Sequence, residues 1–278
     1  MATTNVLGLF DDLSELDGLF VILDPPSDSV GSGGGEVMPG PPVEWNPASP
    51  VRDYDWSFFT VAADGGAQVR YSGRGATLIA PSFAVCAHHA RGSGTFYWVP
   101  YAGGAEVSRT STMTEGVDYW NIEGDLGLIK LNAPVTTVAP IPILADSAKA
   151  SGRNALAIEM DRHLNLLLLG SFSNASAAVA WSFTSADQIE GGDSGKPVFV
   201  IVNGTPVLVV SAILDTNGGP NASHYIDEIQ AILDASGEEL TLWNIVGGVG
   251  GVAQSSATSP SLSTAFSPTS MPLVLLGA

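Results

Sequence analysis

Three short segments of the sequence contain residue types that could carry out nucleophilic and acid–base chemistry. The first is residues 191–197 (GGDSGKP), in which glycines flank a serine, so that the backbone can turn tightly and a substrate carbonyl can approach. In such a turn the backbone N–H groups of Gly192 and Ser194 can converge on one point and stabilise an oxyanion. Taken alone, this segment is equally consistent with an ordinary glycine-rich turn before a strand.

Two other segments lie upstream of this turn. Residues 76–89 (ATLIAPSFAVCAHH) predict a strand, a turn at Pro81 and a second strand that ends at His88 and His89. Residues 123–131 (EGDLGLIKL) place Asp125 at the start of an apolar strand. The order along the chain is therefore histidine, aspartate and serine, each at the boundary of a predicted element.

The elements that must position these residues are mostly short strands. Between about residues 56 and 242, short apolar segments alternate with turn signals, and the sequence predicts strands at residues 76–79, 95–99, 126–131, 155–159, 164–170, 198–202 and 207–213. Asn203 and Gly204 separate the last two segments, and an Asn-Gly pair between β-branched runs is a strong hairpin signal. Many short strands at this spacing favour an all-β barrel or sandwich.

One helix is predicted over residues 223–236, near the end of this β-rich region. Asn221 or Ser223 can cap its start, and Gly237 can close its end. Its apolar residues recur at helical spacing on one face: Tyr225, Ile226, Ile229, Ile232 and Leu233. The pattern predicts a helix that packs on the β-rich body.

Together the three segments resemble the motifs of the trypsin/chymotrypsin-like serine proteases. That family has a strand, a Pro-containing turn, a strand ending in Ala-Ala-His, then Asp-Ile-Ala-Leu-Leu-Lys-Leu, then Gly-Asp-Ser-Gly-Gly-Pro, in this order. The resemblance covers roughly residues 56–242 and is closest to compact bacterial and viral members, because the intervening segments are short. It implies an all-β fold of two packed antiparallel six-stranded β-barrels, about residues 55–135 and 136–222, with a C-terminal helix.

The resemblance also implies roles for the three residues and a polypeptide as the substrate. Ser194 would be the nucleophile, His89 the base that takes its proton, and Asp125 the group that orients the imidazole and stabilises its charge. The N–H groups of Gly192 and Ser194 would form the oxyanion hole. His88 is an alternative base, and we favour His89 because neighbouring residues on a strand face opposite sides.

Several positions depart from the family pattern. Lys196 replaces the second glycine after the serine, and the disulfide that usually flanks the histidine is absent. The family pairs the aspartate before the serine with a new N-terminus; here Asp193 would need another partner, such as Arg153 or Arg162. An alternative is that Asp193 is solvated and the oxyanion hole imperfect.

The substrate pocket is less well defined by the motifs. The simplest alignment places Gln188 at the base of the pocket with Ile189 beside it, so a strict preference for Arg or Lys is not expected. Asp187 or Glu190 would enter the pocket only after a shift of the loop. The strand that pairs with the substrate backbone resembles residues 211–213, which are Ser211, Ala212 and Ile213.

Composition and charge exclude several other classes of protein. The chain of 278 residues has 28 Asp and Glu against 10 Lys and Arg, a formal net charge of −18, which argues against binding nucleic acid through phosphate neutralisation. A single cysteine, Cys86, excludes an intrachain disulfide framework, and its best interpretation is a buried core residue. His88 and His89 have no suitably spaced third ligand, so no metal or other cofactor is predicted.

The two ends of the chain differ from the central region in composition. Residues 1–50 carry eight acidic residues and no basic one, and they read as an acidic leader with a possible weak amphipathic helix over residues 1–24 and a Gly/Ser/Pro-rich linker over residues 25–42. Residues 243–278 form an uncharged, low-complexity tail, which leaves residues 51–242 as the protease-like domain.

The ends also bear on location and on an alternative function. No conventional signal peptide and no membrane span are predicted, and a bacterial or phage-associated protein fits the pattern, while localisation and oligomeric state are left open. Lys196, the acidic leader and the uncharged tail favour a second hypothesis, namely a catalytically inert or weak binding or structural module of a bacterial surface or phage particle.

Overall fold

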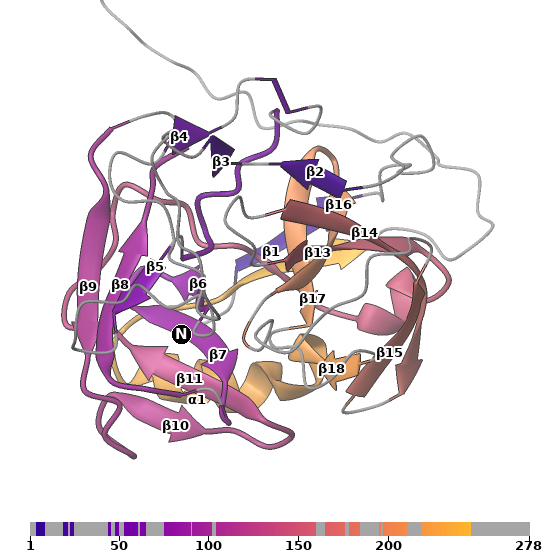
Figure 1. The fold of residues 1–278 in the computed structure, drawn as a ribbon. Helices are drawn as coiled ribbons and strands as arrows, with labels where there is room; N and C mark the ends of the chain where they lie inside the picture. Colours follow the sequence, from indigo (N-terminus) through magenta and orange to yellow (C-terminus); the bar gives the residue numbers. More distant parts are fainter. Residues whose placement is uncertain are drawn as a thin grey trace, which may run out of the picture.

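The protein is largely built of β-strands (Figure 1). The structure, a computed structural model, describes residues 4–8, 19–21, 23–24, 44–45, 48–49, 53–60, 62–64, 75–89, 91–101, 104–159, 165–175, 178–183, 195, 197–210 and 218–245. Most of the strand pairs are antiparallel, and the described residues contain one α-helix, near the C-terminal end of the described chain. The predicted all-β class with a C-terminal helix is therefore confirmed.

The histidine and aspartate segments belong to a four-stranded sheet with the order β10-β11-β7-β6. Its strands are β6 (Thr77–Ala80), β7 (Phe83–Ala87), β10 (Tyr119–Asn121) and β11 (Leu126–Lys130). A three-stranded sheet with the order β5-β8-β9 comes from the same part of the chain and contains β5 (Ala62–Asp64), β8 (Gly94–Trp98) and β9 (Val107–Ser111). All pairs within these two sheets are antiparallel.

The C-terminal half of the chain forms most of a ten-stranded sheet, ordered β1-β19-β12-β17-β16-β13-β14-β15-β18, with β2 paired to β14. Its later strands are β12 (Ile143–Leu144), β13 (Asn154–Glu159), β14 (Asn165–Ala175), β15 (Ala178–Phe183), β16 (Val198–Val202), β17 (Thr205–Val210), β18 (Gly218–Pro220) and β19 (Thr241–Ile245). Neither the closure of the sheets nor a count of six strands per barrel follows from this pairing, so both stay predictions.

The weak amphipathic helix expected near the N-terminus is wrong. Parts of that segment are strands instead: β1 (Thr4–Gly8), β2 (Leu19–Val21) and β3 (Leu23–Asp24), the last paired with β4 (Glu44–Trp45). β1 runs parallel to β19, and β2 runs antiparallel to β14. Pairing with strands far away in the sequence supplies backbone hydrogen bonds that outweigh a weak helical periodicity.

The hairpin expected at Asn203 and Gly204 is confirmed. β16 and β17 pair antiparallel on either side of these two residues, with Val202 opposite Thr205. Both turn residues have positive φ, 50° for Asn203 and 72° for Gly204, as a two-residue hairpin of type I′ requires. Residues 211–213, which the sequence assigned to the end of the second strand, lie outside the described residues.

Replacing Gly204 with alanine is expected to destabilise the protein by about 1 kcal/mol, because an L-residue is strained at positive φ while the added methyl group meets no atom within 4 Å. Urea unfolding of the variant would measure the loss. The matched control is Thr136→Ala, at an exposed position without positive φ, which should change stability little. Equal unfolding free energies for wild type and Gly204→Ala would contradict the turn assignment.

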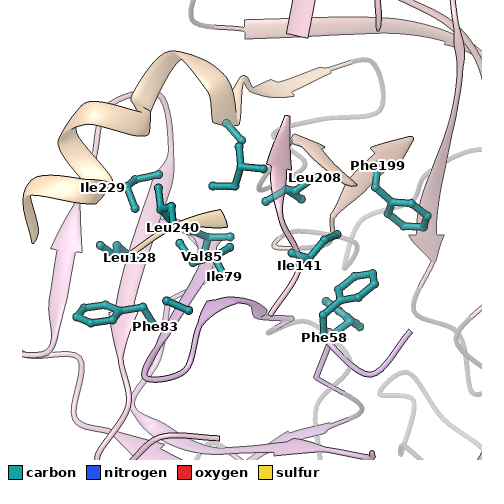
Figure 2. Close-up of a cluster of buried hydrophobic side chains, with 14 of the residues drawn as sticks. Phe58, Ile79, Phe83, Val85, Leu128, Ile141, Phe199, Leu208, Ile229 and Leu240 are labelled. Atoms are coloured by element: carbon teal, nitrogen blue, oxygen red, sulfur yellow. The ribbon is translucent and has the colours of Figure 1, made fainter. Parts of the chain in front are cut away.

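Buried side chains on the central strands alternate between separate hydrophobic clusters. On β16, Phe199 and Ile201 face one cluster, and Val198, Val200 and Val202 face another. The first cluster also receives residues from β6, β7, β11 and β17, and Figure 2 shows Ile79, Val85, Leu128, Leu208 and Phe199 among its members. The larger core therefore joins the sheet that carries the histidine and aspartate to the ten-stranded sheet.

The predicted helix is present but shorter than expected. α1 (Ile226–Asp234) follows a 3₁₀ turn, Ala222–Tyr225, in which the backbone N–H of Ser223 donates to the side-chain oxygen of Asn221 at 3.2 Å. Gly237 closes the helix with φ of 74°. Ile229 and Leu233 are fully buried in the large core, as the apolar spacing predicted.

Candidate active site

The pairing of β7 with β11 brings the histidines and the aspartate together. In this antiparallel ladder Ala87 lies opposite Leu126. The next residue after β7, His88, therefore meets the residue before β11, Asp125, and the backbone N–H of His88 donates to the backbone carbonyl of Asp125 at 2.7 Å. The candidate site therefore lies at the edge of the sheet where β7 ends and β11 begins. The register of these two strands specifies which residues meet there.

His89 is bound to the carboxylate of Asp125 at two points. Its backbone N–H donates to Asp125 Oδ1 at 2.8 Å, and its ring Nδ1 lies 2.5 Å from Asp125 Oδ2. Because a carboxylate only accepts, Nδ1 is the donor in the bond between the two side chains. The His89 side chain is 48% exposed and the Asp125 side chain 12%, so the imidazole is accessible and the carboxylate is shielded.

The backbone that carries Asp125 adopts an uncommon conformation. Gly124 and Asp125 both have positive φ, 69° and 72°. Aspartate tolerates this region better than most residues, whereas a Cβ on Gly124 would also lie 2.8 Å from the Tyr225 hydroxyl oxygen. Burial, with the nearby charges of Glu123 and Glu228, raises the pKa of Tyr225 above its ordinary value, so its hydroxyl stays protonated at neutral pH. The turn before Asp125 is therefore packed against Tyr225, the last residue of the 3₁₀ turn that precedes α1.

His88 has different surroundings from His89, as strand alternation predicted. Its ring Nδ1 lies 2.6 Å from the hydroxyl oxygen of Tyr119, on β10, and the two rings are stacked. The Nδ1 atom of His88 thus bonds to a phenol, and the Nδ1 atom of His89 to a carboxylate. Only His89 has the partner that the base of a catalytic triad needs.

The residue that follows the candidate nucleophile packs against the histidine-bearing segment. A Cβ placed on Gly195 would lie 2.6 Å from the carbonyl oxygen of Gly75 and 3.4 Å from the amide nitrogen of Ala87, two residues before His89. The φ of Gly195 is 89°, a value that favours glycine. Gly75 is equally confined, because a Cβ there would lie 2.6 Å from the ring of Phe59. The close approach of the two segments therefore requires glycine at position 195, and the packing of Phe59 favours glycine at position 75.

Several residues that the sequence assigned to the site lie outside the described residues. These are the proposed nucleophile, the oxyanion-hole glycine and the substrate-pocket residues: Ser194, Gly192, Gln188, Ile189, Ser211, Ala212 and Ile213. Asp193, Lys196 and Arg162 also fall outside, while Arg153 lies at an exposed position just before β13. The structure therefore brings together His89 and Asp125, and the assignment of the other site residues stays a prediction.

Cys86 is a core residue, in agreement with the sequence interpretation. It is 5% exposed and belongs to the cluster that contains Leu78, Phe96 and Ile129. Burial, with a smaller contribution from the charge of Asp125, raises the pKa of its thiol to about 12. The thiol is therefore protonated at neutral pH and unsuited to act as a nucleophile.

Cys86 is expected to react with a thiol reagent only when the protein unfolds. With a pKa of about 12, its thiolate fraction at pH 8 is smaller than that of an exposed cysteine by roughly three orders of magnitude. Absorbance on reaction with a chromogenic disulfide would measure the rate in native protein and in guanidinium chloride. A Thr136→Cys variant supplies an exposed thiol as the control, and equal reaction rates for the two thiols in native protein would contradict the burial of Cys86.

Sequence reasoning missed the partners that surround the two histidines. Tyr119 precedes Asp125 by six residues, but its contact with His88 depends on the β10–β11 register, in which Tyr119 lies opposite Ile129. The helix residue Tyr225 was identified only as part of an apolar face, and its contact with Gly124 spans about a hundred residues of chain. No local signal in the sequence pairs Tyr119 with His88.

Two of the solved structures that are similar to this chain are those of peptidases. One such structure is kallikrein-related peptidase 10, with a TM-score of 0.49 and 12% identity, and another is neuropsin, a serine protease expressed in the limbic system of mouse brain, with a TM-score of 0.48 and 13% identity. Each similarity covers 64% of this chain and 95% of the other. Matches this distant carry no argument about the chemistry of the site.

Comparisons at the sequence level find no counterpart: no protein-family model and no curated protein matches the chain. Within the described part of the chain, no helix has the length and apolar character needed to span a bilayer. The functional assignment therefore depends on the site itself, that is, on the His89–Asp125 geometry and on the motif that contains Ser194.

Proposed function

We propose that the protein is a serine endopeptidase, which hydrolyses peptide bonds through an acyl-enzyme and uses His89, Asp125 and Ser194. The observation that carries the proposal is the pairing of His89 Nδ1 with Asp125 Oδ2 at 2.5 Å, on an accessible imidazole whose backbone N–H binds the same carboxylate. A carboxylate that fixes the tautomer of an exposed histidine prepares its Nε2 to act as a general base.

The contact of Gly195 with Gly75 and Ala87 supports the choice of Ser194 as the nucleophile. Gly195 directly follows Ser194 in the sequence, and it packs against the backbone two residues before His89. Serine is a weak nucleophile until an adjacent base takes its proton, so the nucleophile and the base must lie within hydrogen-bond reach of each other. The glycine contact joins the two motifs at the point where the mechanism requires them to meet.

In the proposed reaction, Ser194 Oγ attacks the carbonyl carbon of the peptide bond while Nε2 of His89 takes the hydroxyl proton. The oxyanion is held by the N–H groups of Gly192 and Ser194, each worth roughly 3–4 kcal/mol in comparable sites. The tetrahedral intermediate then expels the amine, which receives the proton from His89. Water then attacks the acyl-enzyme while the same imidazole takes its proton. The ester bond to Ser194 breaks, the carboxylic acid product leaves, and His89 returns the proton to Ser194 Oγ.

In these steps the carboxylate of Asp125 orients His89 and stabilises the imidazolium that forms twice in each cycle. The pocket for the substrate side chain is assigned to Gln188 and Ile189, with residues 211–213 as the strand beside the substrate backbone. Because neither Gln188 nor Ile189 carries a negative charge, we propose that cleavage is not restricted to peptide bonds that follow Arg or Lys.

Digestion of an unfolded protein tests the proposal. The full chain is incubated with a reduced and alkylated polypeptide, and new termini are identified by mass spectrometry for wild type and for Ser194→Ala. Cleavage by the wild type that is absent from a folded Ser194→Ala variant supports the endopeptidase. Equal cleavage by both would refute Ser194 as the nucleophile, and the residue found before the new cuts reports the pocket preference.

A further inference from the structure

His88, the neighbour of His89 in the chain, belongs to a second polar pair. Tyr119 is fully buried, yet its hydroxyl oxygen lies 2.6 Å from His88 Nδ1. The two rings are nearly parallel, with an interplanar angle of 22° and centroids 5.9 Å apart. The Arg91 guanidinium lies 5.4 Å from the centre of the Tyr119 ring, so both His88 and Arg91 contact this tyrosine. Arg91 also lies 3.8 Å from a carboxylate oxygen of Glu115.

The space for the tyrosine hydroxyl depends on a glycine in β11. A Cβ on Gly127 would lie 2.7 Å from the Tyr119 hydroxyl oxygen and 2.9 Å from the sulfur of Cys86. Real Cβ atoms essentially never approach other atoms that closely, so Gly127 leaves a notch in the strand two residues after Asp125. The hydroxyl fills this notch, and its direction toward His88 is fixed by packing.

The hydroxyl of Tyr119 keeps its proton at neutral pH. Burial, together with the neighbouring Cys86, raises the pKa of Tyr119 well above its ordinary value, although Arg91 partly opposes the shift. A protonated phenol can both donate and accept, so the Tyr119 hydroxyl can bond to His88 Nδ1 in either tautomer of the ring.

The backbone of His88 connects this pair to the proposed catalytic residues. Its N–H donates to the Asp125 carbonyl at 2.7 Å, and the next N–H, that of His89, donates to Asp125 Oδ1 at 2.8 Å. Fixing the His88 side chain therefore fixes the peptide unit from which the His89 ring extends. The orientation of that ring decides whether Nε2 can reach a reacting serine.

We propose that His88 and Tyr119 are positioning residues, which hold the end of β7 so that the His89 imidazole is kept in its catalytic orientation. The inference rests on the proposed function, since it assigns the pair a role in the same site. The two side chains act as one unit, because each fixes the backbone only through its bond to the other. Removing either partner should therefore have nearly the effect of removing both.

The test is a double-mutant cycle on the full chain with His88→Ala, Tyr119→Phe and the combined variant. Each single change is expected to lower kcat roughly tenfold, since small misplacements of reacting groups cost up to about 100-fold. KM should change less than twofold, and the combined variant should match the single ones. His88→Asn, which keeps a polar atom at the Nδ1 position, should restore most of the activity. His224→Ala, at an exposed histidine on the helix side, is the control and should leave kcat unchanged.

Several outcomes would overturn the proposal while the wild type remains active. They are unchanged kcat in both single variants, a change confined to KM, losses that multiply in the combined variant, or no recovery with His88→Asn.

An inactive wild type would instead refute the proposed function. The positioning role would then be tested by NMR, through the chemical shift of the proton on His89 Nδ1. We expect its resonance to shift in Tyr119→Phe and to stay in place in His224→Ala. An unmoved resonance in Tyr119→Phe overturns the positioning role.

Discussion

Replacing His89 with alanine is expected to lower kcat for peptide hydrolysis by at least roughly 10³-fold, because it removes the general base and the partner of Asp125. The neighbouring His88→Ala change should lower kcat only roughly tenfold, because His88 bonds to Tyr119 and not to the carboxylate. Steady-state kinetics on a peptide identified in the digestion experiment would measure both variants.

The comparison of the two histidines provides its own control. Both changes remove an imidazole from consecutive residues at the same strand end, so they differ mainly in which partner is lost. Melting temperatures of the two variants should lie close to that of the wild type. A larger loss in His88→Ala than in His89→Ala would show that the base has been assigned to the wrong residue.

The second large effect is expected at Gly195. Replacement with alanine would place a methyl group 2.6 Å from the Gly75 carbonyl oxygen, at a φ of 89° that strains any L-residue. Backbone atoms cannot move aside as a flexible side chain can, so the turn itself must shift. We expect a loss of about 2–3 kcal/mol in the free energy of unfolding and, because the adjacent Ser194 moves with the turn, a loss of activity of roughly 100-fold.

Gly152 provides the matched control for this change. Its φ is 78°, close to that of Gly195, but a Cβ there would meet no atom within 4 Å. Gly152→Ala should therefore show the backbone strain alone, about 1 kcal/mol, and leave the activity unchanged. Unfolding in urea and kinetics on the same peptide would separate the effect of backbone strain from the effect of the steric contact with Gly75. Equal stability losses in both variants, with full activity in Gly195→Ala, would mean that the glycine contact does not position the nucleophile.

Features of the fold that depend on neighbouring residues could be predicted from the sequence. The Asn203–Gly204 hairpin follows from a dipeptide that accepts positive φ, and the helix follows from apolar spacing between Asn221 and Gly237. The N-terminal helix was wrong because β1 and β2 pair with β19 and β14, strands more than 140 residues away. Such pairing leaves little trace in the local pattern of hydrophobicity.

The same distinction applies to the candidate site. The meeting of His89 with Asp125 could be anticipated, because both lie at the ends of predicted strands in motifs of recognisable composition. The His88–Tyr119 bond and the Gly75–Gly195 contact could not, since each depends on a register or on a close approach between distant segments. Glycines at positions 75, 127 and 195 look alike in the sequence, and only the packing shows what each one makes room for.

The most direct test of the central claim is reaction of the folded, full-length chain with a fluorophosphonate, followed by mass spectrometry of its peptides. The mechanism predicts one adduct per chain, located on Ser194, absent from Ser194→Ala and formed at least roughly 10³-fold more slowly in His89→Ala. A folded wild type that forms no adduct, or an adduct on any other residue, would contradict the assignment of Ser194, His89 and Asp125 as a catalytic triad.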